Sequence, residues 1–399
     1  MIRTKRFLGL MDRLGGSRIT KPGSWFLLYV MPVAAGISLY MFLTLLSVYL
    51  SPQNAGVIQS VRSITPLANL SIPGLNPFLP ITYGWLALII AMVIHEGAHG
   101  VVARSLNLPV KSAGLIFFLI LPIGAFVDVD ENLLKTARAR DSVRVLAAGA
   151  GINFVVAFAS LAVVLLMVSV MVPVAQGAYV TAVTPNSPAL GAGVQGGDFV
   201  TEINGIPITN TSVIRTNYKP GQAINVTVWR SGNSLQFNDV KLATCSFVDP
   251  QTNKTVTYTC LGIIVSDTVS GNTLQQLPKN YLNLLNGRLL AYICPPTFPR
   301  CAGEIPFSDS WIGFYNTPLG GAFPILINVF YWIWFINFFL ATFNSLPIYP
   351  FDGGQAYQIA LKALGRGKLS DLAANRITNL TSLLLAFVVM SVIFIPYLI

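Results

Sequence analysis

Five long apolar runs constrain the fold of this chain more than any other feature of its 399 residues. Each run is long enough to cross a lipid bilayer as an α-helix, which takes about 20 residues. Charged residues make up only 10% of the chain, whereas soluble domains carry about 25%. The sequence therefore predicts a polytopic α-helical membrane protein, with spans at residues 24–50, 82–104, 143–172, 321–347 and 377–398.

The basic residues indicate how these spans are oriented. Most of the 25 Lys and Arg residues lie in four segments, at 3–21, 104–111, 135–144 and 362–376. The positive-inside rule assigns such segments to the cytoplasm, so the N-terminus is expected there. The first span has no small-residue cleavage site at its end, which favours a retained helix over a signal peptide. The topology explains the net charge of +10, and no basic patch interleaved with aromatic residues indicates a nucleic-acid partner.

Residues 113–127 are apolar but are interrupted by Pro122 and Gly124. This run is too short for a spanning helix and favours a re-entrant β-hairpin, which is tolerated at membrane depth only where protein or a cavity satisfies its backbone. A hairpin here places residues 173–320 outside the cytoplasm. All four cysteines then lie where disulfides persist; they are Cys245, Cys260, Cys294 and Cys301. The first two flank a predicted hairpin and the last two bracket a Pro-rich loop, although four cysteines allow three pairings.

The chain is expected to consist of seven parts. They are a basic cytoplasmic N-terminus (1–23), an additional transmembrane helix (24–50), an external loop (51–81), the first half of a membrane core (82–172), a β-rich domain (173–243), a cysteine-containing external region (244–320) and the second half of the membrane core (321–399). Short alternating strands such as NVTVWRS and KTVTYTC, separated by turn residues, indicate the β-rich character of the external part.

The second span contains the motif HEGAH, which holds the only two histidines of the chain, His95 and His99. Residues four apart share one face of a helix, so both imidazoles can bind one Zn²⁺ while Glu96 acts as a general base on a water molecule. A chance HExxH match is the alternative. Ionisable groups in hydrocarbon are costly, however, and three of them on one helical turn indicate a shared metal site.

A catalytic zinc site takes three protein ligands and a water molecule. The predicted topology puts the cysteines on the opposite side of the membrane, so the third ligand is expected to be a carboxylate. The candidates are Asp128, Asp130, Glu131 and Asp352. The first three lie close to basic residues and are typical of a solvated edge. Asp352 follows an apolar helix in the stretch NSLPIYPFDGG, whose prolines end the helix and whose glycines free the backbone; a helix-capping Asp is the alternative.

These motifs resemble those of the site-2 protease family of intramembrane zinc metalloproteases. HEGAH lies in one membrane helix, and NSLPIYPFDGG matches the family pattern Asn-x-x-Pro-x-x-x-x-Asp-Gly at the end of a later one. The resemblance implies that Asp352 is the third ligand of one Zn²⁺ per chain. The stretch AAGAGINF is similar to a Gly- and Asn-containing segment of the family, although Ala150 stands where many members have Pro. This implies that Asn153 lies near the substrate strand, and Asn344 is a further candidate to bind substrate backbone.

Residues 177–208 resemble a PDZ domain. A strand leads into Pro-x-Ser-Pro-Ala, a short helix, and then Gly-Val, Gly-Asp and Ile-Asn-Gly. PDZ domains bind peptides by adding a strand to an exposed sheet edge; a small β-domain without peptide binding is the alternative. Family members carry PDZ domains between the two halves of the active site, and the order of segments here is the same.

The features predict an intramembrane zinc metalloendopeptidase with Glu96 as the general base. The resemblance implies that it cleaves transmembrane segments of membrane-tethered proteins in regulated intramembrane proteolysis. The expected partners are transmembrane substrates, the bilayer, and a peptide or substrate ectodomain at the PDZ-like domain. The expected location is a prokaryotic cell membrane, with the PDZ-like domain extracytoplasmic and the active site toward the cytoplasm. Alternatives are a metal-binding or transport protein, for which the nearly unbroken apolar spans offer no polar path, and a PDZ-bearing scaffold without activity, against which the complete set of ligands and base argues.

Overall fold

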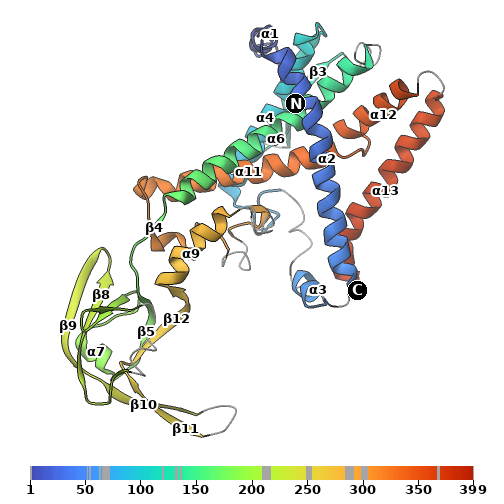
Figure 1. Cartoon of the computed structure of the whole chain (residues 1–399). Helices are drawn as coiled ribbons and strands as arrows, with labels where there is room; N and C mark the ends of the chain where they lie inside the picture. The colour runs from blue at the N-terminus through green and yellow to red at the C-terminus, as the bar shows by residue number, and fades with distance from the viewer. Residues whose placement is uncertain are drawn as a thin grey trace. The chain divides into compact units, whose positions relative to one another are not determined.

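The computed structural model describes most of the chain as two compact units. The described residues are 2–51, 53, 55–62, 64, 72–118, 121–130, 134, 137–208, 217–248, 254–283, 292–297, 304–365 and 369–398. One unit consists of Met1–Val164 together with Ile325–Ile399, and the other of Leu165–Pro324. We call them the helical unit and the β unit, and each is considered by itself (Figure 1).

The helical unit is built around five long apolar helices, as the sequence predicts. They are α2 (Thr20–Leu50), α4 (Ile81–Ser105), α6 (Ala139–Ser169), α11 (Phe323–Ser345) and α13 (Asp371–Leu398). Shorter helices accompany them: α1 (Leu8–Gly15), α3 (Ala55–Arg62) and α12 (Asp352–Leu364). Large apolar side chains such as Phe26 on α2 and Phe387 on α13 are exposed, which suits helices surrounded by lipid rather than water.

The ends of these helices differ from the predicted spans because hydropathy registers only the apolar part of a helix. Helix α13 begins six residues before the predicted span, where the backbone N–H of Ala373 donates to Ser370 Oγ at 3.2 Å as an N-cap. Helix α11 ends at Ser345, two residues early, because Pro347 disfavours helical backbone in the residue before it.

A three-stranded sheet lies beside α4 in the helical unit. Strands β2 (Val110–Phe118) and β3 (Leu121–Val129) form an antiparallel hairpin, and β1 (Ile2–Thr4) pairs with the other edge of β2. Neither β1 nor α1 is expected from the sequence, which indicates only a basic N-terminal segment.

Helix α1 packs closely on α4 (Figure 1). A Cβ at Gly15 would lie 3.0 Å from both Arg104 Cβ and the carbonyl oxygen of Val101, so the absence of a side chain there permits the approach. Arg104 Nε also forms an ion pair with Asp12 Oδ1 at 3.2 Å. These tertiary contacts hold a helix of eight residues that is too short to be stable alone.

The β unit contains a six-stranded antiparallel sheet with the order β12-β5-β6-β8-β9, and β7 (Ile206–Pro207) pairs with β6. The strands are β5 (Ala178–Val183), β6 (Phe199–Ile203), β8 (Ala223–Arg230), β9 (Asn233–Lys241) and β12 (Ile263–Ser270). Alternate residues of β8, namely Ile224, Val226 and Val228, are buried in its core, as the period of a half-buried strand requires.

The sheet extends beyond residue 243, the boundary expected from the sequence for the β-rich domain. Strand β12 pairs with β5, whereas the intervening residues form a separate hairpin of β10 (Ala243–Val248) and β11 (Thr255–Cys260). The β10–β11 hairpin is therefore inserted in the sequence between β9 and β12, two strands of the same sheet. Amino-acid composition does not predict such an insertion.

The β unit also contains the helix α9 (Gly271–Leu282) and several short elements, among them the 5-residue helix α7 (Pro188–Ala192). Strand β4 (Val172–Pro173) pairs with β13 (Tyr315–Asn316), and short 3₁₀ helices occupy Ile312–Phe314 and Gly320–Ala322. A disulfide joins Cys245 to Cys260 across the β10–β11 hairpin, with Cα atoms 5.8 Å apart. Cys294 is disulfide-bonded, and Cys301 lies outside the described residues.

Candidate functional site

Helix α4 presents His95, Glu96 and His99 from the middle of its apolar length. The two imidazole centroids are 4.8 Å apart, and one ligand atom from each of the three side chains lies within 4.8 Å of the others. Both histidines are buried. The helical spacing of four residues therefore brings the two rings to one place, as predicted from their sequence positions.

Asp352 reaches the same place from the first residue of α12. Its Oδ2 lies 3.0 Å from His95 Nε2 and 3.3 Å from His99 Nε2. The same oxygen is buried, and these two imidazole nitrogens are the polar partners that the described part of the chain places beside it. A buried carboxylate oxygen between two imidazole nitrogens calls for a positive charge at that point.

Two glycines allow α12 to begin where it does. A Cβ at Gly353 would collide with the carbonyl group of Ser345, and one at Gly354 would collide with the peptide between Ile348 and Tyr349. The turn after α11 therefore touches the first turn of α12 directly, backbone against backbone. The two glycines that follow Asp352 thus permit the close backbone contact that holds Asp352 against the end of α11.

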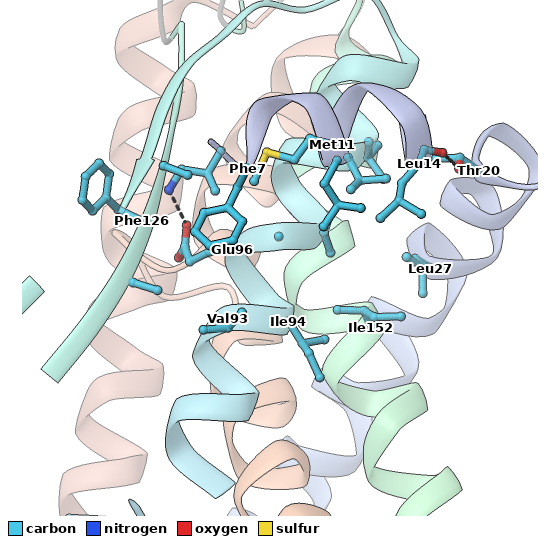
Figure 2. Close-up of a pocket in the computed structure, with 18 of the residues that line it drawn as sticks. Phe7, Met11, Leu14, Thr20, Leu27, Val93, Ile94, Glu96, Phe126 and Ile152 are labelled. Atoms are coloured by element: carbon cyan, nitrogen blue, oxygen red, sulfur yellow. Dashed lines mark hydrogen bonds between the residues drawn. The ribbon is translucent and has the colours of Figure 1, made fainter. Parts of the chain in front are cut away.

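Glu96 is oriented by strand β3 rather than by the histidines. Its Oε2 accepts a hydrogen bond from the backbone N–H of Val127 at 3.0 Å, drawn dashed in Figure 2. Glu96 also lines an almost entirely apolar cavity of about 900 Å³. Side chains from α1, α2, α4, α6 and the β2–β3 hairpin surround it, among them Phe7, Ile94 and Phe126 (Figure 2).

Three of the candidate metal-binding and catalytic residues line a second, smaller cavity of about 280 Å³. His95, Glu96 and Asp352 line it together with Asn344 of α11 and Gly124 of β3. Asn344, the first residue of the NSLPIYPFDGG stretch, thus lines the same cavity as the carboxylates of Glu96 and Asp352. Asn153 is not among the residues that line this cavity; it is fully buried, with Nδ2 3.4 Å from His95 Nδ1.

The other candidate ligands have different partners. Asp130 forms an ion pair with Lys111 at 2.9 Å, and Asp128 lies 3.9 Å from Arg3. Glu131 lies outside the described residues. Of the described carboxylate candidates, Asp352 is the one that the structure brings to the two histidines.

The arrangement fits a zinc ion. Donor atoms about 2.0–2.1 Å from a tetrahedral Zn²⁺ lie about 3.3 Å from one another, and Asp352 Oδ2 lies 3.0 and 3.3 Å from the two imidazole nitrogens. Two imidazoles and one carboxylate are also an established ligand set for catalytic zinc. An ion held between the buried oxygen of Asp352 and the two imidazole nitrogens would neutralise the carboxylate there.

A HExxH helix with a converging carboxylate, set among five helices that are long and apolar enough to span a membrane, defines a membrane-embedded metallopeptidase. The model of peptidase family M50 matches residues 83–286 and 310–389. The chain belongs to this family, the site-2 protease family, as the sequence motifs predict.

Two relatives extend the comparison. An uncharacterized protein of Methanocaldococcus jannaschii is 26% identical over 356 residues, which cover 88% of this chain and 75% of that protein. Zinc metalloprotease RasP of Shouchella clausii is 25% identical over 225 residues, which cover 55% of this chain and 50% of RasP. The matched part therefore spans half the length of the relative whose name states an activity.

Proposed function

We propose that the protein is a zinc endopeptidase that cleaves the transmembrane segments of membrane-tethered proteins. His95, His99 and Asp352 hold one Zn²⁺ per chain. The observation that carries this assignment is the position of Asp352 Oδ2, 3.0 and 3.3 Å from the two Nε2 atoms. Membership of a metallopeptidase family supports it.

Glu96 is the general base and then the general acid. When bound, Zn²⁺ activates a water molecule and polarises the scissile carbonyl. Glu96 removes the proton of the attacking water and transfers it to the amine that leaves. The hydrogen bond from Val127 N–H to Oε2 holds the carboxylate in place while leaving its second oxygen for this proton.

The substrate is expected to bind as an extended strand. A helix hides its peptide groups, so a transmembrane substrate has to unwind before it is cut. Strand β1 pairs with the outer edge of β2 at Ala113–Leu115, whereas the outer edge of β3 pairs with no other described strand; we assign strand addition to this edge of β3. Val127, whose N–H reaches Glu96, lies on β3, and Asn344 lines the adjoining cavity, where its amide is available to the substrate backbone.

The hairpin and the β unit complete the proposal. The β2–β3 hairpin re-enters the membrane, where the pairing of its two strands and the hydrogen bond from Val127 N–H to Glu96 satisfy part of its backbone and a bound substrate strand would satisfy more. The β unit lies on the extracytoplasmic side of a prokaryotic cell membrane and includes a PDZ-like domain. Its sheet ends in β12 and β9, two edges that offer strand addition to a peptide. It admits substrates whose ectodomains have already been shortened, as regulated intramembrane proteolysis requires.

The test compares Glu96→Gln with wild type in cells, with membrane-protein fragments identified by mass spectrometry. We expect the fragments to fall about 100-fold or more, since removal of a general base typically costs this much, while zinc content is unchanged. Glu202→Gln, on β6 of the β unit, is the matched control and keeps the fragments. Unchanged fragments in Glu96→Gln contradict the proposal and favour a metal-binding or transport protein, which does not need the base.

A further inference from the structure

We propose that Asn153 is a positioning residue for His95: its side-chain amide accepts a hydrogen bond from His95 Nδ1–H and so holds Nε2 toward the metal. The inference rests on the proposed function, because it concerns how the zinc ligands are oriented. It assigns Asn153 to the support of the site, in place of the contact with substrate expected from the sequence resemblance.

Helix α6 supports both histidines from one face. Val145, Gly149 and Asn153 are spaced by four residues on this helix, so they lie along one ridge, and the histidines have the same spacing on α4. At the first position, the carbonyl oxygen of Val145 lies 2.7 Å from His99 Nδ1. At the second, a Cβ on Gly149 would collide with Nε2 of both His99 and His95. At the third, the amide of Asn153 lies 3.4 Å from His95 Nδ1.

The contact of His99 fixes its tautomer. A carbonyl oxygen only accepts hydrogen bonds, so His99 Nδ1 carries the proton and donates it to Val145. In the neutral imidazole, the Nε2 atom of His99 is then unprotonated and free to bind a metal. Metal-bound histidines typically donate the proton of their other ring nitrogen to an acceptor in this way, and the acceptor is important for metal affinity.

Asn153 provides the equivalent contact for His95. Its two amide ends have the same shape, and the orientation of an amide is chosen from its hydrogen bonds. With Nδ2 toward His95, Asn153 Oδ1 is buried and has no partner among the described residues. With Oδ1 toward His95, the amide accepts from Nδ1–H, and Nε2 becomes a zinc ligand. Only the second orientation agrees with the ligand set.

Burial makes this contact consequential. Asn153 has no exposed surface, and a buried amide is costly unless it is hydrogen-bonded. A side chain of this kind on an apolar membrane helix needs a specific partner, and among the described residues His95 Nδ1 is the polar atom that its amide contacts.

The experiment measures zinc affinity of the purified full-length protein by competition with a chromophoric chelator, independently of peptidase activity. Asn153→Leu keeps the approximate size but removes the acceptor, and we expect zinc to bind about 10- to 100-fold more weakly. Asn153→Asp restores an acceptor and is expected to bind within a few-fold of wild type. The visible spectrum of bound Co²⁺ should change in the Leu variant and remain like wild type in the Asp variant.

Asn337→Leu is the matched control. Asn337 is also a fully buried Asn on a long apolar helix, but its amide donates to the carbonyl oxygen of Ile333 at 2.8 Å. Its replacement leaves zinc affinity unchanged. If Asn153→Leu does not fold, Asn153→Ala, which fills no extra space, takes its place with the same expected loss.

Wild-type affinity in Asn153→Leu or Asn153→Ala would overturn the inference, as would an equal loss in Asn153→Asp. A wild-type protein that binds no zinc is a different result, because it overturns the proposed function itself.

Discussion

At the scale of single residues, the site depends on how closely α6 approaches the two imidazoles. Gly149 is the point of closest approach, because a Cβ there would collide with both Nε2 atoms. The position has no other need for glycine: it lies inside a helix, where Ala is intrinsically more favourable by roughly 0.5–1 kcal/mol. The absence of a side chain at Gly149 therefore leaves room for the two imidazoles that we propose as metal ligands.

We predict that Gly149→Ala weakens zinc binding although it favours the helix. The added methyl group displaces both Nε2 atoms from the positions at which they converge with Asp352. Zinc content after dialysis is the measurement, and we expect it to fall below that of wild type. The collision with the packed imidazoles exists without metal as well, so the zinc-free variant is not expected to melt above zinc-free wild type.

Gly36→Ala on α2 serves as the control for Gly149→Ala, since a Cβ there meets no neighbour within 4 Å. Full zinc content in Gly149→Ala would show that the side chains of α4 move freely enough to avoid the collision, contrary to the packed arrangement described above.

The residues of the site differ in how far the sequence predicts them. His95, Glu96 and His99 follow from helical spacing alone. Asp352 is one of four candidates on local grounds and is distinguished by its family motif. Val145 could not be predicted, because a backbone carbonyl has no sequence signature. Gly149 could not either, since a glycine in an apolar helix is common and its meaning depends on which neighbour it faces.

At the scale of elements, the site requires α12 to begin in direct contact with the turn that follows α11. The Gly353 position makes that contact with the carbonyl group of Ser345. A side chain there moves the first turn of α12, and Asp352 is part of that turn.

We therefore predict that Gly353→Ala reduces zinc content and peptide cleavage together, although no ligand is changed. The collision is with backbone, which yields less readily than a side chain. Metal analysis of the purified variant, with Asp352 intact, is the measurement. If Gly353→Ala retains both zinc and cleavage, the position of Asp352 does not depend on this contact.

The elements, like the residues, differ in whether local sequence or contacts with distant parts of the chain determine them. The five apolar helices could be predicted because membrane spans are set by length and hydropathy. Helix α1 and strand β1 could not, since they have only eight and three residues, too few to be stable on their own. They form through contacts with partners distant in sequence: Gly15 against α4, and the pairing of Arg3 with Gly114 on β2.

At the scale of the whole molecule, the proposed topology separates a cytoplasmic-side site from a β unit on the oxidising side of the membrane. The disulfide between Cys245 and Cys260 agrees with this placement, because such bonds persist outside the cytosol. It closes a hairpin whose two strands also pair through their backbones.

We predict that the double substitution Cys245→Ser and Cys260→Ser destabilises this hairpin. The two cysteines are 15 residues apart, and the chain-entropy estimate for a loop of this size is about 3 kcal/mol. Limited proteolysis of the full-length protein should show faster cleavage within residues 243–260, while zinc content stays at the wild-type level. Unchanged proteolysis would mean that β10 and β11 need no covalent link.

The central claim is that two histidines on α4 and one carboxylate on α12 form a single zinc site. Its most direct test is the zinc content of the purified full-length protein, measured by inductively coupled plasma mass spectrometry for wild type, Asp352→Asn and Glu96→Gln. The account predicts close to one zinc per chain in wild type and Glu96→Gln, and a clear deficit in Asp352→Asn, whose amide lacks the charge that balances the metal. Equal zinc in wild type and Asp352→Asn, or none in wild type, would contradict it.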